Sequence, residues 1–195
     1  MLSLEESLKI LKKTRALIEG HFILSSGLHS SRYIQCAQLL SKPHQASKIC
    51  ESLAEKITNE FTDFNLILSP AMGGIIIGYE IGKLLNKETI FCERVKGKFT
   101  LRRGFHIKKD TKVLIVEDVI TTGKSSIECV KLIKKSKAKL VGFASIIDRS
   151  SKKSLKIKKP IISHLKINVP TYSKRKLPKD LKLTPITTPG SRFIK

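Results

Sequence analysis

The sequence predicts an α/β fold in which a mostly parallel central sheet is flanked by helices. Short apolar runs alternate along the chain with longer segments whose apolar residues recur at helical spacing. The run at 113–116 consists of valine, isoleucine and leucine, which is typical of a strand buried on both faces of a parallel sheet. The 195 residues are enough for one domain with its own core.

The first half of the chain contains two predicted helices before its first buried strand. Ser3 and Glu6 have the spacing of a capping box, which predicts that an amphipathic helix begins there. A hydroxyl-rich turn between short apolar pieces occupies 20–40, and Pro43 then begins the second helix. A strand at 65–70, a turn of small residues at 71–74, a helix at 75–85 and a strand at 88–94 follow.

The second half begins with a basic segment, 95–110, that shows no clear periodicity. After the strand at 113–116, Glu117 and Asp118 are expected at its carboxyl end. A loop at 121–126 leads into a helix ending near residue 137, and strands follow at 140–148 and near 161–167. Ligands of parallel sheets bind outside the carboxyl ends of the strands, so the segments that follow these strands are candidate binding sites.

Cysteine usage and hydropathy limit the class of protein. The four cysteines are scattered without a Cys-x-x-Cys pair, which disfavours a zinc site or disulfide framework and is typical of reduced thiols in a cytoplasmic protein. The N-terminal segment is charged from its start, so we expect no secretory signal. The most apolar segment, 66–82, is interrupted by proline, glycine and glutamate, so we expect no membrane span.

The net charge of +22 is unusual, because 38 Lys and Arg residues stand against 16 acids. Such a balance often indicates a nucleic-acid partner. Here the lysines are spread along the whole chain, and aromatic residues, which would provide stacking surfaces for bases, make up only 6%. We interpret most of the charge as solvated surface and a minority as serving anionic substrates, which disfavours nucleic acid as a partner.

The segment 113–126 has the form of a phosphate-binding unit. A strand, a glycine-containing turn and a helix start direct backbone N–H groups and a helix dipole at an anion. An ATP-binding P-loop needs a glycine five residues before its Gly-Lys pair, where this chain has Asp118. Two adjacent carboxylates suit the vicinal hydroxyls of a phosphorylated ribose, or a divalent cation. An ordinary strand–turn–helix unit with two solvated acids remains the alternative.

The same segment resembles the phosphoribosyl pyrophosphate (PRPP) signature of the type I phosphoribosyltransferases. Four more segments, 20–37, 69–82, 91–105 and 144–150, look in their order and spacing like the orotate phosphoribosyltransferases of that family. The resemblance covers nearly the whole chain and implies the type I phosphoribosyltransferase fold in a single domain, 1–195. It places the core at about 41–149 and a small hood at about 1–40 plus about 150–195.

The resemblance implies a set of PRPP-binding residues. Glu117 and Asp118 would hold the ribose hydroxyls, with Asp118 at the reacting centre, and the loop 121–125 would hold the 5′-phosphate. Lys98 would be catalytic, stabilising the charge that grows on the departing pyrophosphate. The expected PRPP-binding residues are Arg94, Lys98, Glu117, Asp118, Val119, Ile120, Thr121, Thr122, Gly123, Lys124 and Ser125. The alternatives for the catalytic role are Lys96, Arg102 and Arg103, and His106 is a further candidate for a pyrophosphate contact. The alternative for the whole segment is a solvated basic hairpin.

The remaining implied contacts concern pyrophosphate and orotate. The backbone of Ala71, Met72, Gly73 and Gly74 would face the pyrophosphate, with a plain strand-to-helix turn as the alternative. Tyr33, Thr121 and Arg149 would contact orotate, with Arg149 binding its carboxylate. A surface turn around Tyr33 and an Asp148–Arg149 ion pair are the alternatives. Relatives carry lysines where this chain has Ser25 and Gly73, so the corresponding charged contacts to PRPP are missing here.

The implied reaction joins orotate and PRPP to give orotidine 5′-monophosphate and pyrophosphate in pyrimidine synthesis. Mg²⁺ is the expected cofactor, bound through PRPP and not directly by protein ligands. The basic segment is expected to close over the active site of a partner subunit, which implies a homodimer. Two rivals remain open: a phosphoribosyltransferase for a purine base, and a non-catalytic relative that senses PRPP or a nucleotide and binds nucleic acid.

Overall fold

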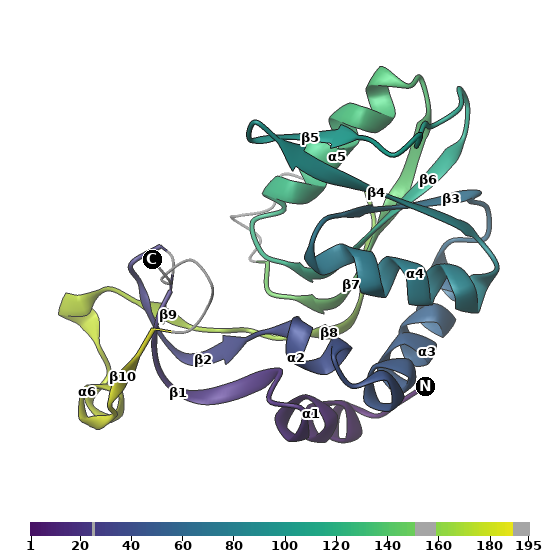
Figure 1. Cartoon of the computed structure of the whole chain (residues 1–195). Coiled ribbons are helices and arrows are strands. Elements are labelled where there is room, and N and C mark those ends of the chain that lie inside the picture. Colours follow the sequence, from purple (N-terminus) through teal and green to yellow (C-terminus); the bar gives the residue numbers. More distant parts are fainter. Residues whose placement is uncertain (25, 151–158, 189–195) are drawn as a thin grey trace.

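The computed structural model describes residues 1–24, 26–150 and 159–188. Its largest element is a six-stranded sheet with the order β5-β4-β3-β6-β7-β8 (Figure 1). All neighbouring strands in it are parallel except β4 and β5, which form an antiparallel hairpin. These strands are β3 (Leu66–Pro70), β4 (Glu88–Val95), β5 (Lys98–Leu101), β6 (Lys112–Ile120), β7 (Lys139–Asp148) and β8 (Ile161–Lys166). The predicted α/β fold with a mostly parallel sheet is confirmed.

Helices cover both faces of this sheet (Figure 1). They are α3 (Pro43–Glu60), α4 (Gly73–Leu85) and α5 (Lys124–Lys135). Leu114 and Val116 of β6 belong to the apolar cluster that includes α3 and α4, whereas Val113 and Ile115 belong to the cluster that includes α5. Because side chains alternate along a strand, β6 supplies both cores. This explains why the run 113–116 contains no polar residue.

The direction in which the chain crosses the sheet reverses between the neighbouring strands β3 and β6. From β3 the chain passes through α4 to β4 and β5, and from β6 it passes through α5 to β7 and β8. The loops that follow both strands therefore leave from the same edge of the sheet. In open α/β sheets a ligand binds outside the carboxyl ends of strands at such a reversal.

A second, smaller sheet has the order β10-β1-β2-β9 and lies beside the first (Figure 1). Both ends of the chain contribute to it: β1 (Leu17–Ile23) and β2 (His29–Ile34) come early, and β9 (Thr171–Tyr172) and β10 (Ile186–Thr187) come late. Three helical segments adjoin it in sequence, namely α2 (Cys36–Leu40), η1 (Lys174–Lys176) and α6 (Lys179–Leu183). We refer to the small sheet with η1 and α6 as the hood.

A buried histidine pair connects the two ends of the chain within the hood. His21 Nε2 lies 2.7 Å from His29 Nδ1, and His21 Nδ1 lies 3.2 Å from the carbonyl oxygen of Thr184. Since a carbonyl only accepts hydrogen bonds, His21 donates from Nδ1 to Thr184. The two rings thus complete a chain of hydrogen bonds that holds the C-terminal segment against β1.

The N-terminal helix α1 (Leu4–Lys13) begins at the predicted capping box. The Ser3 hydroxyl accepts from the Glu6 N–H at 3.1 Å, and the Ser3 N–H donates to the Glu6 carboxylate at 2.8 Å. On the buried side of α1, Ser7 Oγ lies 2.8 Å from His164 Nε2 of β8. Burial lowers the pKa of His164 to about 4, and the Lys56 ammonium acts in the same direction. The helix is thereby attached to the edge strand of the large sheet.

One expected boundary was wrong. Strand β6 extends to Ile120, so Glu117 and Asp118 lie inside the strand and not after it. The strand continues because it still pairs with β7 through Ile120 after its pairing with β3 has ended at Ile115. The segment 95–110, for which a basic hairpin was the alternative, does form one with β4: β5 pairs antiparallel with it, and the turn residues Lys96 and Gly97 have φ of 48° and 79°. Positive φ at both central residues is the geometry of a two-residue hairpin turn.

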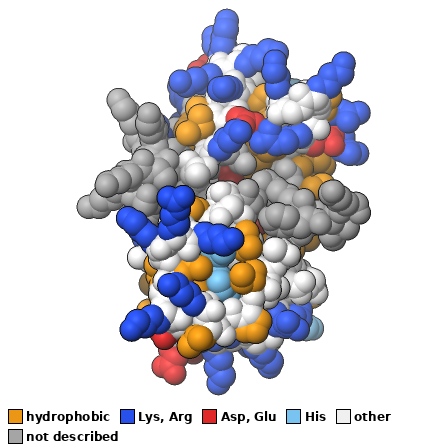
Figure 2. Space-filling view, turned by 90° about the vertical axis from the view of Figure 1, so that its left-hand side faces the viewer, with side chains coloured by type: hydrophobic (Ala, Val, Ile, Leu, Met, Phe, Trp, Pro, Cys, Tyr) orange, Lys and Arg blue, Asp and Glu red, His pale blue; other side chains and the backbone are white. Residues whose placement is uncertain are grey.

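The surface carries its positive charge in a dispersed form. Figure 2 shows Lys and Arg side chains over the upper and the lower part of one face, with apolar and acidic side chains between them. On this face the coloured Lys and Arg side chains are therefore dispersed and do not form one patch. Among the helices that the structure describes, none is long and apolar enough to cross a membrane.

Candidate active site

Two adjacent acids of β6, Glu117 and Asp118, lie at the reversal between β3 and β6. Consecutive side chains of a strand point to opposite faces of the sheet. Accordingly, Glu117 Oε1 accepts a hydrogen bond from Ser126 Oγ of α5, whereas the Asp118 carboxylate lies against Gly73 at the start of α4. The two acids are therefore fixed by the two different helices that begin at this edge of the sheet.

Burial controls the ionisation of both acids. Glu117 is only 7% exposed. Burial raises the pKa of Glu117 from 4.5 to about 7, the Ser126 hydrogen bond opposes this, and the charge of Asp118 adds to it. Burial also raises the pKa of Asp118, against hydrogen bonds from backbone N–H groups. Because burial penalises both ionised carboxylates, a ligand that donates hydrogen bonds or brings a cation is favoured here.

The loop between β6 and α5 presents free N–H groups to a ligand. Gly123 precedes the helix with φ of 68°, a left-handed conformation that favours glycine, and its carbonyl accepts from the Ile127 N–H at 2.8 Å. No described side chain caps this end of α5, so the N–H groups of its first turn lack intrahelical partners. With the exposed Thr121, Thr122 and Lys124, they form a site suited to a phosphate.

The segment 71–74 brings a second helix start to the same acids. The Ala71 N–H donates to the Cys92 carbonyl at 2.8 Å, and the Ala71–Met72 peptide bond is cis. Helix α4 then begins without a side-chain cap from the described residues. A Cβ atom at Gly73 would lie 2.5 Å from Asp118 Oδ2. Any side chain at position 73, including the lysine of some relatives, would therefore displace the Asp118 carboxylate.

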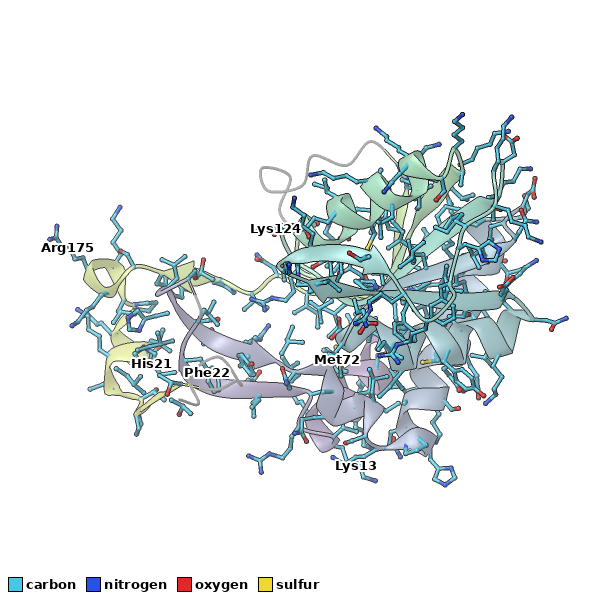
Figure 3. All side chains as sticks on the ribbon, turned by 45° about the horizontal axis from the view of Figure 1, so that its top comes forward. Lys13, His21, Phe22, Met72, Lys124 and Arg175 are labelled. Atoms are coloured by element: carbon cyan, nitrogen blue, oxygen red, sulfur yellow. The ribbon has the colours of Figure 1, made fainter. Side chains whose placement is uncertain are left out.

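The two helix starts lie on the same side of the core. Figure 3 shows Lys124, at the start of α5, and Met72, just before α4, on the side of the large sheet nearest the hood. Both of the segments that begin these helices therefore lie on the side of the large sheet nearest the hood. A ligand with two separated anionic groups fits this arrangement.

Arg149 follows β7 and lies close to the hood strand β2. Its backbone N–H donates to the Ile120 carbonyl at 2.8 Å, which fixes its place beside the end of β6. Burial lowers the pKa of Arg149, while Tyr33 and Cys36 act in the opposite direction. Its Nε is buried and has no hydrogen-bond partner among the described residues. A buried, unpaired guanidinium nitrogen next to an aromatic residue is suited to a planar carboxylate ligand.

The alternative ion pair between Asp148 and Arg149 does not occur among the described residues. Asp148 instead accepts from the Ser150 N–H at 2.7 Å and lies 3.7 Å from the Lys166 ammonium. The Tyr33 ring stacks at 5.7 Å from the ring of Phe22 in β1. Tyr33 and Arg149, both expected to contact orotate, lie close enough for Tyr33 to raise the pKa of the Arg149 guanidinium.

Ion pairs divide the basic residues of the β4–β5 hairpin into two groups. The pairs are Arg94–Glu128 at 2.8 Å, Arg102–Glu93 at 3.7 Å and Arg103–Glu93 at 3.3 Å. Lys96 and Lys98 form no ion pair within the described part of the chain and are exposed. The hairpin therefore carries two ammonium groups without an ion-pair partner among the described residues, that of Lys96 in the turn and that of Lys98 directly after it.

Sequence reasoning missed Ser126 and Glu128, which hold Glu117 and Arg94. Neither has a sequence signal of its own, because their partners lie on strands that only the fold brings next to α5. His106 is exposed, with Nδ1 3.2 Å from the Gly104 carbonyl oxygen. Ser25 lies outside the described residues. Those residues contain no group of three or more His, Cys, Asp or Glu side chains that could hold a metal ion.

Replacing Glu117 by Gln should stabilise the protein at alkaline pH. Glu117 has a pKa of about 7 in the folded protein, against an ordinary value of 4.5, so its ionisation destabilises the fold. The stability that depends on neutral Glu117 is fully present below pH 4.5 and is lost as the pH rises through 7. Glutamine never ionises, so Glu117→Gln should unfold at a higher temperature than the parent at pH 8 but not at pH 4.5. The gain in the free energy of unfolding at pH 8 should be at most about 3 kcal/mol.

Thermal unfolding at both pH values measures this effect. The exposed acid Glu88 provides the matched control, because Glu88→Gln should show no such pH-dependent gain. A Glu117→Gln variant that is less stable than the parent at pH 8 would show that the buried carboxylate is stabilised by its surroundings when ionised.

Comparison with known proteins places the chain in a family. Residues 37–174 match the phosphoribosyl transferase domain family. The orotate phosphoribosyltransferase of Parvibaculum lavamentivorans is 46% identical over 191 residues, covering 97% of this chain and 98% of that protein. The orotate phosphoribosyltransferase of Erythrobacter litoralis is 43% identical over 189 residues, covering 96% of this chain and 97% of that protein.

A solved structure agrees with the fold. Orotate phosphoribosyltransferase from Aeropyrum pernix superposes with a TM-score of 0.70 at 24% identity, covering 82% of this chain and 92% of that one. At this identity the likeness concerns the fold, whereas the sequence relatives match over nearly their full lengths. The family expected from the motifs is confirmed, and the chain belongs to the orotate phosphoribosyltransferases.

Proposed function

We propose that this chain transfers the ribose 5-phosphate group of PRPP to orotate, giving orotidine 5′-monophosphate and pyrophosphate in pyrimidine synthesis. The observation that carries the proposal is the contact between Gly73 and Asp118, which joins two uncapped helix starts to one pair of carboxylates. PRPP has a phosphate, vicinal hydroxyls and a pyrophosphate in this order. The loop 121–125, the acids 117–118 and the segment 71–74 offer matching groups.

Each part of PRPP has a proposed partner. The N–H groups at the start of α5, with Thr121, Thr122 and Lys124, would hold the 5′-phosphate. Asp118 and Glu117 would accept hydrogen bonds from the ribose hydroxyls. The backbone at Gly73 and Gly74 would face the pyrophosphate, because glycine allows the phosphate oxygens to approach closely. Val119 and Ile120 continue β6 between these groups and keep them at a fixed separation.

Orotate would lie between the hood and the large sheet. Arg149 would bind its carboxylate, Thr121 would contact it from the phosphate loop, and Tyr33 would lie against its ring. The buried Arg149 Nε supports this assignment, because a guanidinium pairs with a planar carboxylate through two parallel hydrogen bonds. A purine base has no carboxylate, so it would leave this buried group unpaired. For this reason we favour orotate over the purine alternative.

The chemistry proposed for the reaction is placement and electrostatics, without a covalent nucleophile. The ribose C1–oxygen bond to pyrophosphate breaks ahead of bond formation to orotate, which gives the transition state oxocarbenium character. The negative charge that grows on the departing oxygens would be stabilised by Lys98 and Arg94. Mg²⁺ would enter bound to PRPP and neutralise its pyrophosphate, and the two carboxylates near the ribose are suited to holding such a complex through its hydroxyls.

We also propose a homodimer in which the β4–β5 hairpin serves the active site of the partner subunit. Three large apolar side chains of the α4 region support an interface: Met72, Ile76 and Tyr79 are 82%, 55% and 67% exposed. Their spacing places them on one side of the helix, directly beside the segment 71–74. Exposed apolar stripes of this kind mark contact surfaces, and a partner covering this one would stand next to the pyrophosphate site.

The four cysteines are all free and buried, which supports a cytoplasmic location. The dispersed charge seen in Figure 2 supports the view that nucleic acid is not the partner. The presence of Lys98, Glu117 and Asp118 also favours an enzyme over a non-catalytic relative, since a protein that only senses a nucleotide does not need a catalytic lysine.

Orotate consumption, followed by ultraviolet absorbance, tests the reaction directly. The complete mixture of protein, orotate, PRPP and Mg²⁺ should consume orotate, and omission of PRPP or Mg²⁺ should stop it. Adenine and hypoxanthine in place of orotate test the purine alternative. Turnover of a purine but not of orotate, by a folded protein, would contradict the proposal.

Replacing Lys98 by Ala should lower kcat at least ~10²-fold, because a positioned cation that stabilises transition-state charge is lost. The unfolding temperature should stay unchanged, since Lys98 is exposed and has no described ion-pair partner. Lys9→Ala, on the exposed face of α1, is the control and should keep full activity. Steady-state kinetics measures the effect, and an unchanged kcat would transfer the role to Lys96.

The same variant tests whether the hairpin acts across subunits. Mixing Lys98→Ala with Asp118→Asn should restore part of the activity, because a mixed dimer then contains one site with an intact hairpin and an intact acid. Two inactive proteins that remain inactive after subunit exchange would contradict a shared site.

A further inference from the structure

Arg94 is held on three sides at the base of the hairpin turn. Its Nη1 donates to Glu128 Oε2 at 2.8 Å and to the Gly97 carbonyl oxygen at 2.7 Å. Its guanidinium carbon lies 4.1 Å from the centre of the Phe99 ring. Phe99 is the residue that pairs with Arg94 across the hairpin. One nitrogen thus connects the α5 helix to the hairpin turn, and the stacking contact fixes the plane of the group.

Glu128 is the member of this arrangement that comes from outside the hairpin. It lies in α5, after the loop 121–125 proposed to hold the 5′-phosphate, and its side chain is 20% exposed. The next residue, Cys129, is buried with its Sγ 3.5 Å from Cys92 Sγ of β4. The buried Cys129 thus contacts β4 from α5, and Glu128 extends from the helix directly beside this contact.

The base of the hairpin is anchored by Phe99, which is buried in the apolar cluster of α5, whereas the turn residues Lys96 and Gly97 are exposed. β5 is the edge strand of the large sheet and pairs only with β4. Its turn, Lys96–Gly97, has positive φ at both residues. Lys98 is the first residue after the turn and pairs with Val95. Any change in the angle of the turn therefore changes the direction in which the Lys98 ammonium extends.

We propose that Glu128 is a positioning residue for Lys98, acting through Arg94, which it holds against the Gly97 carbonyl. This proposal rests on the proposed function, because it takes Lys98 as the group that stabilises the departing pyrophosphate. Glu128 touches no substrate. It orients the hairpin turn relative to α5 of its own subunit, and thereby sets the direction in which Lys98 extends toward the active site of the partner subunit. Misplacement of a reacting group by about 1 Å costs on the order of 10²-fold in rate.

The Arg94 side chain can serve both this connection and the pyrophosphate. Only Nη1 is engaged by Glu128 and Gly97, and a guanidinium has five N–H donors. Arg94 is thus held in one orientation before substrate arrives, which reduces the entropy lost when a ligand binds. The effect of Glu128 should therefore appear in kcat through Lys98, in addition to any effect on the KM for PRPP through Arg94.

A double-mutant cycle tests the proposal with the full-length protein. The variants are Glu128→Ala, Lys98→Ala and the two combined, with steady-state kinetics for PRPP and orotate. Glu128→Ala should lower kcat ~10-fold, and Glu128→Gln should lie between it and the parent, because the glutamine oxygen still accepts from Arg94. In the Lys98→Ala background, removal of Glu128 should change kcat less than ~2-fold, because its effect passes through the missing lysine.

Glu80→Ala is the matched control. Glu80 also lies on a helix, forms an ion pair with Lys83 at 3.2 Å and has a side chain 18% exposed, close to the value for Glu128. Its replacement should leave kcat unchanged, and the unfolding temperature of every variant identifies a loss that comes from misfolding.

Two results would overturn the proposal and each has a distinct meaning. If Glu128→Ala lowers kcat by the same factor with and without Lys98, or does not lower it, Glu128 does not act through the lysine, although the proposed reaction stands. If Lys98→Ala itself leaves kcat unchanged, the role of Lys98 in the proposed function fails first.

Discussion

The close approach of Gly73 to Asp118 is the constraint on which the candidate site depends. A single added carbon at position 73 would meet the carboxylate at 2.5 Å, so only glycine at this position leaves Asp118 in its present orientation. In this orientation the Asp118 carboxylate lies directly against the segment 71–74.

The sheet topology explains why this contact forms where it does. β3 and β6 are parallel neighbours from which the chain departs in opposite directions, so the helices that follow them cover opposite faces. Glu117 and Asp118 are consecutive residues and therefore point to these opposite faces, one to Ser126 of α5 and the other to Gly73 of α4. In the proposed complex, the two carboxylates, the two helix starts and the part-buried Arg149 would surround a ligand with complementary groups.

The local motifs could be predicted from sequence, and the contacts between them could not. The apolar run 113–116, the capping box at Ser3 and the proline at the start of α3 each have a local physical cause. The extension of β6 through Glu117 and Asp118 depends on pairing with β7. Likewise, Ser126 and Glu128 gained their roles from partners on other elements. Side-chain spacing along one segment contains no signal for such contacts.

The most direct test of the account is the affinity for PRPP, measured by isothermal titration calorimetry with Mg²⁺ for the parent protein and for Gly73→Ala. The added carbon should rotate the Asp118 carboxylate away, and this loss of a hydrogen bond to a charged group should weaken binding at least ~10-fold. The unfolding temperature should change little, because the atom that must move is the end of a side chain. Unchanged affinity in the folded variant would contradict the claim that the Gly73–Asp118 contact forms the site.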